Sequence, residues 1–455
     1  MKKIANILRR KIGSEKVKTD EEFCISYSYD ATEIKSNPDI VVFPTSESDV
    51  KSILRIASEY NIPVTPRGSG VGYSGGSVPV KGGIVIVFTR MNKILEIDES
   101  NMLIITEPGV ITGDIIKKSE EAGFFYPPDP ASMRNSTIGG NVAENAGGPR
   151  CFKYGVTSDY VLSLEGFLID GSRVKFGSHS IKDVAGYDLK KIITGSEGTL
   201  IVITKIILKL IPMPESRVLI YLGFNSLRGG SDFVVKMIKM NLSPSALEFI
   251  DKTSLDAVRD YTGSDKDENI NSVVLMELDG TKKEIKNKIR IIRDNATSSD
   301  LKKLKIAKTE KEMEKIWNVR RNLSPAIAKL KPKKINEDIA VPIGEITNTI
   351  EYISQLAEEY DIKIVMFGHL GDGNIHTNIM IDPHSEIEIK NSKIVLDKIF
   401  GYVTSVNGTI TGEHGIGLSK KEFLVYQFSE TEIEIFRRIK KVFDPHNLLN
   451  PGKIF

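Results

Sequence analysis

The sequence predicts a two-domain protein of the α+β class. Its 455 residues exceed what one ordinary hydrophobic core serves, so two domains are the starting expectation. From about residue 40 to 215, short β-rich runs such as "DIVVFP" and "GGIVIVF" alternate with helical pieces and glycine-dense loops. Around residues 212 to 216, "PMPES" interrupts the chain. Beyond it glycine is less frequent, and amphipathic Lys/Glu-rich segments alternate with strands such as "SVVLMELDG". This change indicates a second domain.

The character of the chain changes once more near residue 405. Glycine loops return in "NGTITGEHGIG", and the turn-rich tail "FDPHNLLNPGKIF" has no obvious core of its own. We therefore expect residues 1–213 to form one domain and residues 214–405 a second. Residues 406–455 should dock back onto the first domain.

Composition excludes several classes of protein. Lys and Arg number 62 against 60 Asp and Glu, and a formal charge of +2 argues against a dedicated nucleic-acid binder. Two cysteines, Cys24 and Cys151, cannot by themselves hold an iron–sulfur cluster, and a disulfide framework is not expected. Charges break the apolar runs of the N-terminus, unlike a signal peptide, and no run reaches the roughly 20 residues of a membrane helix. We expect a cytoplasmic protein without an integral membrane segment.

The first glycine loop, "PRGSGVGYSGG" at residues 66 to 76, is a candidate phosphate site. Five glycines in eleven residues let the backbone turn tightly and direct its N–H groups at one point, as in an anion-binding nest. The dinucleotide fingerprint fits poorly, because no helix opens directly from the loop and no acidic residue follows at the expected distance. Taken alone, the loop could equally be a structural turn.

Two further glycine loops favour a long, extended ligand. They are "STIGGNVAENAGGPRCFKYG" at 136 to 155 and "GSEGTL" at 195 to 200. Together with "YPPDPAS" at 126 to 132 and "DVAGYDLKKIITGSEGTL" at 183 to 200, they closely resemble the FAD domain of the vanillyl-alcohol-oxidase superfamily. The chain is similar, from about residue 20 to its end, to the branch that holds the glycolate oxidase D subunit, D-lactate dehydrogenase and D-2-hydroxyglutarate dehydrogenase. The resemblance implies a vanillyl-alcohol-oxidase-type FAD-binding domain plus an α+β substrate (cap) domain with an antiparallel sheet.

The resemblance also implies which residues contact FAD. The first loop should hold the pyrophosphate, the segment from Pro128 to Asn145 should follow the pyrophosphate and isoalloxazine, and Asn450 should reach the flavin ring. The candidates are Pro66, Arg67, Gly68, Ser69, Gly70, Val71, Gly72, Ser74, Gly75, Gly76, Pro128, Asp129, Ser132, Thr137, Gly139, Gly140, Asn141, Asn145, Gly147, Gly148, Tyr154, Gly155, Glu197, Gly198, Val202 and Asn450.

Two positions depart from the family pattern. Relatives that link FAD covalently to a histidine carry that histidine where Val71 stands here, so the resemblance implies noncovalent FAD. Relatives usually have glycine after "GSEGTL", where this chain has Ile201. We therefore leave Ile201 out of the expected FAD contacts.

The segment "KIVMFGHLGDGNIHTNIM" at 363 to 380 predicts a hairpin, because two apolar runs flank Gly-Asp-Gly. Side chains alternate along a strand, so Asn374, His376 and Asn378 should share a face, with His369 across from His376. Two imidazoles at cross-strand distance make a divalent-metal site plausible. The other interpretation is two histidines that are merely hydrogen-bonded at a strand end.

A third metal ligand is available in "TGEHGIG" at 411 to 417. The family's metal-dependent members use both histidines of "GHxGDGNxH" and the glutamate of "GEHG", which implies that His369, His376 and Glu413 hold a divalent metal. Zinc is the first choice, with manganese or iron as alternatives. Three protein ligands would leave a position open for substrate. By the same resemblance, His414 is the catalytic base and Asn378 contacts substrate.

The segment "IWNVRRNLSPA" at 316 to 326 supplies a group for the substrate carboxylate. Arg320 matches the family's carboxylate-binding arginine, and Ser324 stands where relatives carry a hydroxyl. A guanidinium binds a carboxylate through two hydrogen bonds, although a solvated helix face is the alternative for these arginines. Asn336 stands where the hydroxyglutarate enzymes have a lysine, which weakens the case for a dicarboxylic substrate, although Lys333 or Lys334 could reach in from nearby.

The resulting hypothesis is an FAD-dependent dehydrogenase that oxidises a D-2-hydroxy acid, D-lactate first and glycolate second, to the 2-oxo acid. Since nothing in the sequence can carry electrons onward, we expect an electron-transferring flavoprotein or iron–sulfur subunit as partner, through which the protein could associate with a membrane. A homodimer is compatible with the sequence. The alternatives are a non-redox enzyme of the alkyl-dihydroxyacetonephosphate synthase type and a non-catalytic electron-transfer subunit.

Overall fold

The computed structural model describes residues 1–263, 268–296 and 300–455. The chain divides into two compact units. The flavin unit, named for the resemblance above, comprises Met1–Gly147, Val156–Met213 and Glu413–Phe455. The cap unit comprises Gly148–Gly155 and Pro214–Gly412. Each unit is therefore assembled from segments that are distant in sequence.

The flavin unit contains two principal sheets. A four-stranded sheet has the order β1-β2-β4-β3, with β2, β4 and β3 parallel and β1 antiparallel to β2. An antiparallel five-stranded sheet has the order β5-β6-β10-β8-β9, and β7 pairs with β11. The strands are β1 (Val17–Lys18), β2 (Ile40–Val42), β3 (Val64–Arg67), β4 (Ile84–Val87), β5 (Ile94–Asp98), β6 (Leu103–Thr106), β7 (Phe124–Phe125), β8 (Val161–Phe167), β9 (Arg173–Gly177), β10 (Val202–Lys209) and β11 (Ile211–Pro212).

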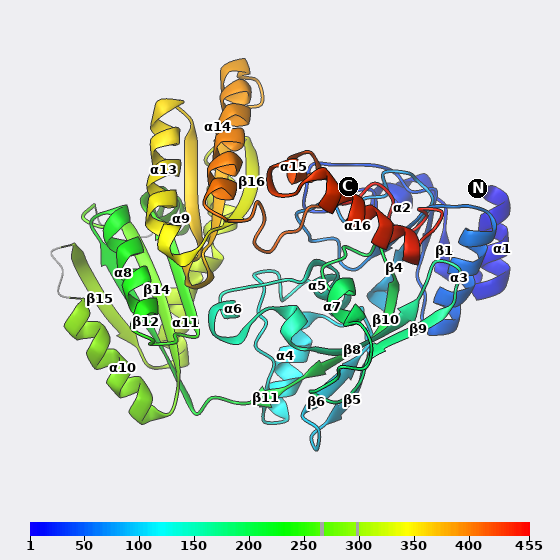
Figure 1. Ribbon diagram of the computed structural model, residues 1–455, viewed down its shortest axis with the longest axis horizontal. Coiled ribbons are helices and arrows are strands. Elements are labelled where there is room, and N and C mark those ends of the chain that lie inside the picture. Colours follow the sequence, from blue (N-terminus) through cyan, green and yellow to red (C-terminus); the bar gives the residue numbers. More distant parts are fainter. Residues whose placement is uncertain (264–267, 297–299) are drawn as a thin grey trace. The chain divides into compact units, whose positions relative to one another are not determined.

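Helices cover the four-stranded sheet because their apolar stripes match its buried face. Helices α1 and α3 lie side by side (Figure 1), and Leu8 and Ile53 are among the fully buried residues that pack with Ile84 in one core. Ser46 begins α3 by accepting a hydrogen bond from the Asp49 N–H. The helices are α1 (Lys2–Ile12), α2 (Glu21–Ile25), α3 (Glu47–Glu59), α4 (Thr112–Glu121), α5 (Ile138–Glu144), α7 (Leu189–Ile193), α15 (Leu424–Gln427) and α16 (Glu430–Phe443).

The cap unit is built on one antiparallel seven-stranded sheet, which confirms the expected sheet type. Its order is β15-β12-β14-β13-β17-β18-β16. The strands are β12 (Ser216–Phe224), β13 (Ala246–Asp251), β14 (Ser272–Gly280), β15 (Leu301–Ala307), β16 (Lys333–Ala340), β17 (Lys363–His369) and β18 (Asn374–Ile381). The candidate histidines therefore come from two neighbouring strands on one side of the sheet's centre.

Helices pack on both faces of this sheet. One core joins Ile250 and Phe367 to apolar residues of α9, α11 and α12. On the opposite face, Gly230 of α8 lies close to Phe249. The helices are α6 (Cys151–Tyr154), α8 (Leu227–Lys239), α9 (Lys252–Thr262), α10 (Lys282–Asn295), α11 (Glu310–Arg321), α12 (Leu323–Ile327), α13 (Ile346–Glu359) and α14 (Glu386–Ser405).

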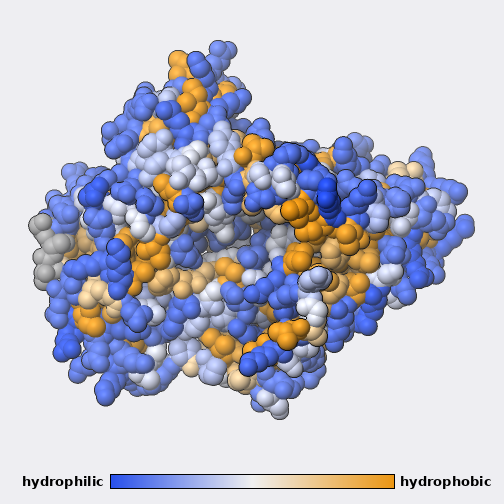
Figure 2. All heavy atoms as spheres, viewed as in Figure 1, coloured by the Kyte–Doolittle hydropathy of each residue, from blue (hydrophilic) through white to orange (hydrophobic). Residues whose placement is uncertain are grey.

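The face of the molecule drawn in Figure 2 is mostly hydrophilic. On the face drawn in Figure 2, apolar residues form scattered patches among charged and polar ones. Across the described ranges, we find no helix that combines the length and the apolarity needed to cross a membrane.

Candidate active site

A pocket in the flavin unit is lined by all three glycine loops. Sixteen of the expected FAD contacts line it: Pro66, Arg67, Gly68, Ser69, Gly70, Val71, Gly72, Gly76, Ser132, Thr137, Gly139, Gly140, Asn141, Gly147, Glu197 and Gly198. Its wall also includes Asp30, Tyr73, Glu144, Ile201, Ile203, Glu413 and His414. The loops that are far apart in sequence thus contribute to one site.

The first loop has the features of an anion-binding turn. Gly70 has a φ of +71°, and a Cβ added there would lie 2.1 Å from Nη2 of Arg67. A Cβ on Gly68 would lie 2.1 Å from Oγ1 of Thr137. Backbone N–H groups of residues 69 to 72 donate no hydrogen bond to any described residue. The close backbone packing and the available donors fit a pyrophosphate.

The strand that follows "GSEGTL" turns alternate side chains toward the pocket. Ile201 and Ile203 line the pocket, whereas Val202 belongs to the core beneath the four-stranded sheet. Side chains alternate along a strand, so only one of two consecutive residues can face the pocket. The side chain of Ile201 therefore lines the pocket, and a contact of Val202 with FAD stays a prediction.

The other expected FAD contacts lie outside the pocket lining. They are Ser74, Gly75, Pro128, Asp129, Asn145, Gly148, Tyr154, Gly155, Val202 and Asn450. Tyr154 belongs to the cap unit and donates its hydroxyl hydrogen bond to Asp279. The side-chain amide of Asn450 donates to the carbonyls of Gly76 and Glu197 at 2.8 and 2.7 Å, so it joins two pocket loops.

The predicted hairpin forms, with one difference in register. Strands β17 and β18 pair antiparallel, and Phe367, not His369, lies directly opposite His376. His369 is one diagonal step away, and the two imidazole ring centroids are 5.2 Å apart. Both side chains are buried, with 4% and 5% of their surface exposed. A diagonal pair is still within reach of long side chains on one face.

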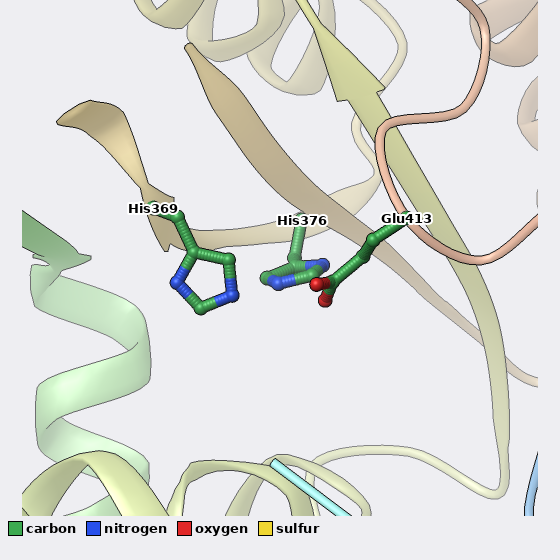
Figure 3. A group of neighbouring side chains, drawn as sticks. All are labelled: His369, His376 and Glu413. Atoms are coloured by element: carbon green, nitrogen blue, oxygen red, sulfur yellow. The ribbon is translucent and has the colours of Figure 1, made fainter. Parts of the chain in front are cut away.

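Glu413 joins these two histidines to form a three-residue cluster. One potential ligand atom from each of His369, His376 and Glu413 lies within 4.8 Å of the others, and the side chains point toward a common centre (Figure 3). Glu413 directly follows Gly412, whose N–H donates to the Asp338 carboxylate of β16 at 2.8 Å. Two imidazoles and a carboxylate suit zinc, manganese or iron, so the donor set fits a divalent metal.

A buried carboxylate that the sequence reasoning missed supports the first histidine. Glu248 of β13 is fully buried and is hydrogen-bonded to Nδ1 of His369. Arg320, at the end of α11, donates from Nε to the other oxygen of Glu248. Burial would raise the pKa of Glu248, but the charges of His369 and Arg320 hold that pKa below its ordinary value. An acidic residue inside the apolar strand "ALEFID" was the available signal.

Arg320 has hydrogen-bond donors left for a further anion. Its guanidinium lies 4.8 Å from the Phe367 ring centroid, and its side chain is only 10% exposed. Its two terminal nitrogens make no hydrogen bond within the described part of the chain. Ser324, by contrast, is exposed on α12 and is not joined to Arg320 by a hydrogen bond.

Asn378 lies on the same face as the histidines. It is fully buried, and neither its Oδ1 nor its Nδ2 has a hydrogen-bond partner among described residues. Asn336 of β16 lies directly opposite it. Since buried amides are normally satisfied, the Asn378 side chain is available to a polar ligand.

His414 forms part of the flavin pocket wall. Its ring centroid lies 5.2 Å from that of Tyr73. The N–H of Ile416, two residues later, donates to Glu197 at 2.8 Å. Because Glu413 and His414 are consecutive, the three-residue cluster and the pocket wall share one loop.

The chain matches known families along most of its length. Residues 38–177 match the FAD binding domain, and residues 213–454 match the C-terminal domain of FAD linked oxidases. Glycolate oxidase subunit GlcD of Bacillus subtilis (strain 168) is 41% identical over 94% of this chain and 92% of that protein. D-lactate dehydrogenase of Anaerostipes hadrus is 34% identical over 98% of this chain and 96% of that protein.

The fold is also that of a solved enzyme. Alkyldihydroxyacetonephosphate synthase is 19% identical, with a TM-score of 0.77 over 100% of this chain and 85% of that chain. At this identity the likeness concerns the fold alone. The chain thus belongs to the FAD-linked oxidases, in the branch of the vanillyl-alcohol-oxidase superfamily that includes glycolate oxidase subunit GlcD and D-lactate dehydrogenase.

Proposed function

We propose that this protein oxidises a D-2-hydroxy acid to the 2-oxo acid with FAD as the hydride acceptor. D-lactate is the first candidate substrate and glycolate the second. One observation carries the proposal: Glu413 belongs to a three-ligand cluster with His369 and His376, and the same residue lines the flavin pocket beside His414. The names of the relatives support this reaction class.

The residues of the site have three tasks. Some bind the substrate, some orient it, and one moves a proton. The terminal nitrogens of Arg320 would bind the substrate carboxylate, and the amide of Asn378 would orient a substrate oxygen. His414 would take the hydroxyl proton as general base. A divalent metal held by His369, His376 and Glu413 would lower the pKa of that hydroxyl. FAD, when bound, supplies the acceptor for the hydride of the α carbon.

Glu248 would orient two of these groups. When His369 donates its Nδ1–H to a carboxylate, its Nε2 lone pair is left for a metal, a tautomer inferred from this hydrogen bond. The same carboxylate accepts a hydrogen bond from Nε of Arg320. The guanidinium is therefore fixed on one edge, and its terminal nitrogens would face the substrate in a defined direction.

Asn336 favours a monocarboxylic substrate. It lies opposite Asn378, at the position where hydroxyglutarate enzymes carry a lysine. Lys334 lies two residues away on the same face, and burial lowers its pKa. A comparison of D-lactate with D-2-hydroxyglutarate is therefore the informative specificity test.

The deciding experiment is anaerobic reduction of the bound flavin. D-lactate should bleach the flavin absorption, and L-lactate should not. If neither lactate nor glycolate reduces the flavin, the non-redox synthase or the electron-transfer subunit becomes the favoured alternative. Acid precipitation should release yellow FAD into the supernatant, because Val71 occupies the histidyl-link position.

We also propose a separate redox protein as electron acceptor, an electron-transferring flavoprotein or an iron–sulfur subunit. The only cysteines, Cys24 and Cys151, are both buried in different parts of the chain, so this polypeptide lacks the ligands of a cluster. Turnover in air should be slow and an artificial dye should restore it. Equal rates with oxygen and dye would show a self-sufficient oxidase.

A further inference from the structure

We propose that Glu144 and Glu197 form a carboxylate pair that holds one proton in the flavin pocket wall, and that ionised Glu197 positions loop 413–417. This loop carries Glu413 and His414, so the inference rests on the function proposed above. Neither carboxylate is one of the assigned metal ligands. Glu197 is a positioning residue here, because it acts through the backbone of the loop.

Glu197 is held in an unusual conformation at the junction of three segments. Its φ of +52° is in the left-handed region, which a non-glycine residue seldom adopts without surrounding constraints. Its N–H donates to the Ala143 carbonyl at 2.8 Å, and its carbonyl accepts from Asn450 at 2.7 Å. The side chain is 5% exposed. These contacts fix the carboxylate relative to the tail and to α5.

The two carboxylate oxygens of Glu197 have different surroundings. Oε1 accepts the Ile416 N–H at 2.8 Å, while Oε2 is buried without a hydrogen-bond partner among the described residues. Hydrogen bonds to an ionised acceptor are stronger than those to a neutral one. The contact to Ile416 therefore holds loop 413–417 most firmly when Glu197 is charged.

Glu144, the last residue of α5, approaches the same loop. The Ser74 hydroxyl lies 3.3 and 3.4 Å from its two oxygens. A Cβ added to Gly415 would lie 2.6 Å from Oε2 of Glu144 and 3.0 Å from Oε1 of Glu197. The two carboxylates therefore flank one glycine, whose φ of +87° also favours the absence of a side chain.

Two carboxylates this close in a buried wall cannot both ionise easily. Burial, and then the charge of Glu197, raises the pKa of Glu144 well above its ordinary value. Burial raises the pKa of Glu197 to about 7, against the lowering effect of the Ile416 and Gly417 N–H groups and Lys453. Above about pH 7 the pair thus carries one negative charge, with its proton on Glu144.

The pocket that the pair lines also includes Asp30, Arg67, Glu413 and His414. Asp30 raises the pKa of Glu144 further, and Lys453, which donates to the Val78 carbonyl, lowers that of Glu197. Lys421 acts on Lys453. As pH falls through about 7, Glu197 gains a proton and its hold on Ile416 weakens. Flavin reduction should therefore slow on the acid side of neutrality.

The first test needs no substrate. The absorption of the oxidised holoenzyme should show one pH transition near 7, because a charge appears beside the flavin. Glu197→Gln should abolish this transition. Glu144→Gln, which replaces a protonated carboxyl with a neutral amide, should keep it. A transition that persists in Glu197→Gln, or that is missing in the wild type, contradicts the pair.

Infrared spectroscopy gives a readout that does not depend on the Glu197 variant. The wild type well above pH 7, where Glu197 is ionised, should show the stretch of a protonated carboxyl, and Glu144→Gln should lose it. An unchanged spectrum in Glu144→Gln would place the proton elsewhere and overturn the proposal.

The positioning role is tested by the pH profile of flavin reduction by D-lactate. Wild type and Glu144→Gln should share an acid limb near pH 7. Glu197→Gln should lose the part of this limb that is due to Glu197 and be about tenfold slower above pH 7, since its amide oxygen still accepts from Ile416 but without charge. If Glu197→Gln kept the wild-type pH profile of flavin reduction, Glu197 would have a structural role only. If D-lactate and glycolate fail to reduce the wild type, the proposed function fails, and the spectral and infrared results still decide the pair.

Discussion

Arg320 and His369 bind the two oxygens of one fully buried carboxylate, that of Glu248. The arginine comes from α11 and the histidine from β17, so β13 links the proposed carboxylate-binding group to the proposed metal site. A change at Glu248 should consequently disturb both groups at once, without removing either of them.

Glu248→Gln should weaken metal binding by about 10- to 100-fold, the usual scale for losing a carboxylate that orients a ligating histidine. The KM for D-lactate should rise as well, because Arg320 loses its charged partner. Metal titration of the purified protein checks the first effect and steady-state kinetics the second. Glu277→Gln is the matched control: Glu277 is buried on the neighbouring strand but bonds Ser245, Arg150 and Trp317. Equal losses in both variants would show a general effect on the fold.

Removal of the metal should abolish flavin reduction by D-lactate while leaving FAD bound, because the pocket and the cluster use largely different residues. The measurement is flavin reduction before and after chelation, with metal analysis. His376→Ala should reproduce the loss, whereas His384→Ala, an exposed histidine, should not. Full activity in a metal-free sample would exclude the metal from the mechanism.

His414→Ala should lower the rate of flavin reduction by roughly 10² or more, the scale for losing a general base. Its metal content and FAD content should match the wild type, since His414 is not in the metal cluster. The exposed His446 provides the control, and His446→Ala should reduce normally. Loss of metal together with activity would instead indicate a ligand role.

Asn336→Lys should shift specificity toward D-2-hydroxyglutarate, because the new ammonium would lie opposite Asn378 and could pair with a distal carboxylate. The ratio of kcat/KM for D-2-hydroxyglutarate over D-lactate should rise by about tenfold or more. Lys333→Ala, on the opposite face of β16, should leave the ratio unchanged. A ratio that does not move in Asn336→Lys would remove this position from the substrate site.

Asp251 should make the cap unit less stable as the pH rises from about 4 to about 6. Burial raises its pKa from 3.8 to about 6, so its protonated form stabilises the fold below that range and the contribution is lost as pH rises through it. The difference corresponds to about 3 kcal/mol. Asp251→Asn keeps an oxygen for the Ser254 N–H and should flatten the dependence, although it loses the bond from the Met366 N–H. Thermal unfolding of both proteins at several pH values measures the slopes, and parallel slopes would contradict the assignment.

Local patterns in the sequence predicted much of this site. The Gly-Asp-Gly hairpin forms, and the three glycine loops meet in one pocket. We expected His369 opposite His376, but Phe367 lies there. A hairpin's register depends on the conformation of its turn, here a 3₁₀ turn over Leu370–Asp372, which the sequence pattern did not reveal. The choice between Ile201 and Val202 depended likewise on where β10 begins.

Glu248 and Glu144 could not be placed from sequence. An acidic residue in a strand or at a helix end is ordinarily solvent-exposed, and only tertiary contacts reveal its partners. The resemblance to relatives suggested candidates for ligand contact, but it did not suggest the residues that hold these candidates in place.

The octapeptide Gly148–Gly155 has a practical consequence for dissecting this enzyme. It belongs to the cap unit, where Arg150 bonds Glu277 and Lys153 and Tyr154 bond Asp279, two carboxylates that are each 2% exposed. A recombinant fragment that begins at Pro214 would leave both acids buried without these counter-groups, so we expect it to express as insoluble material. Grafting the octapeptide onto the fragment's N-terminus through a flexible tether should recover soluble protein.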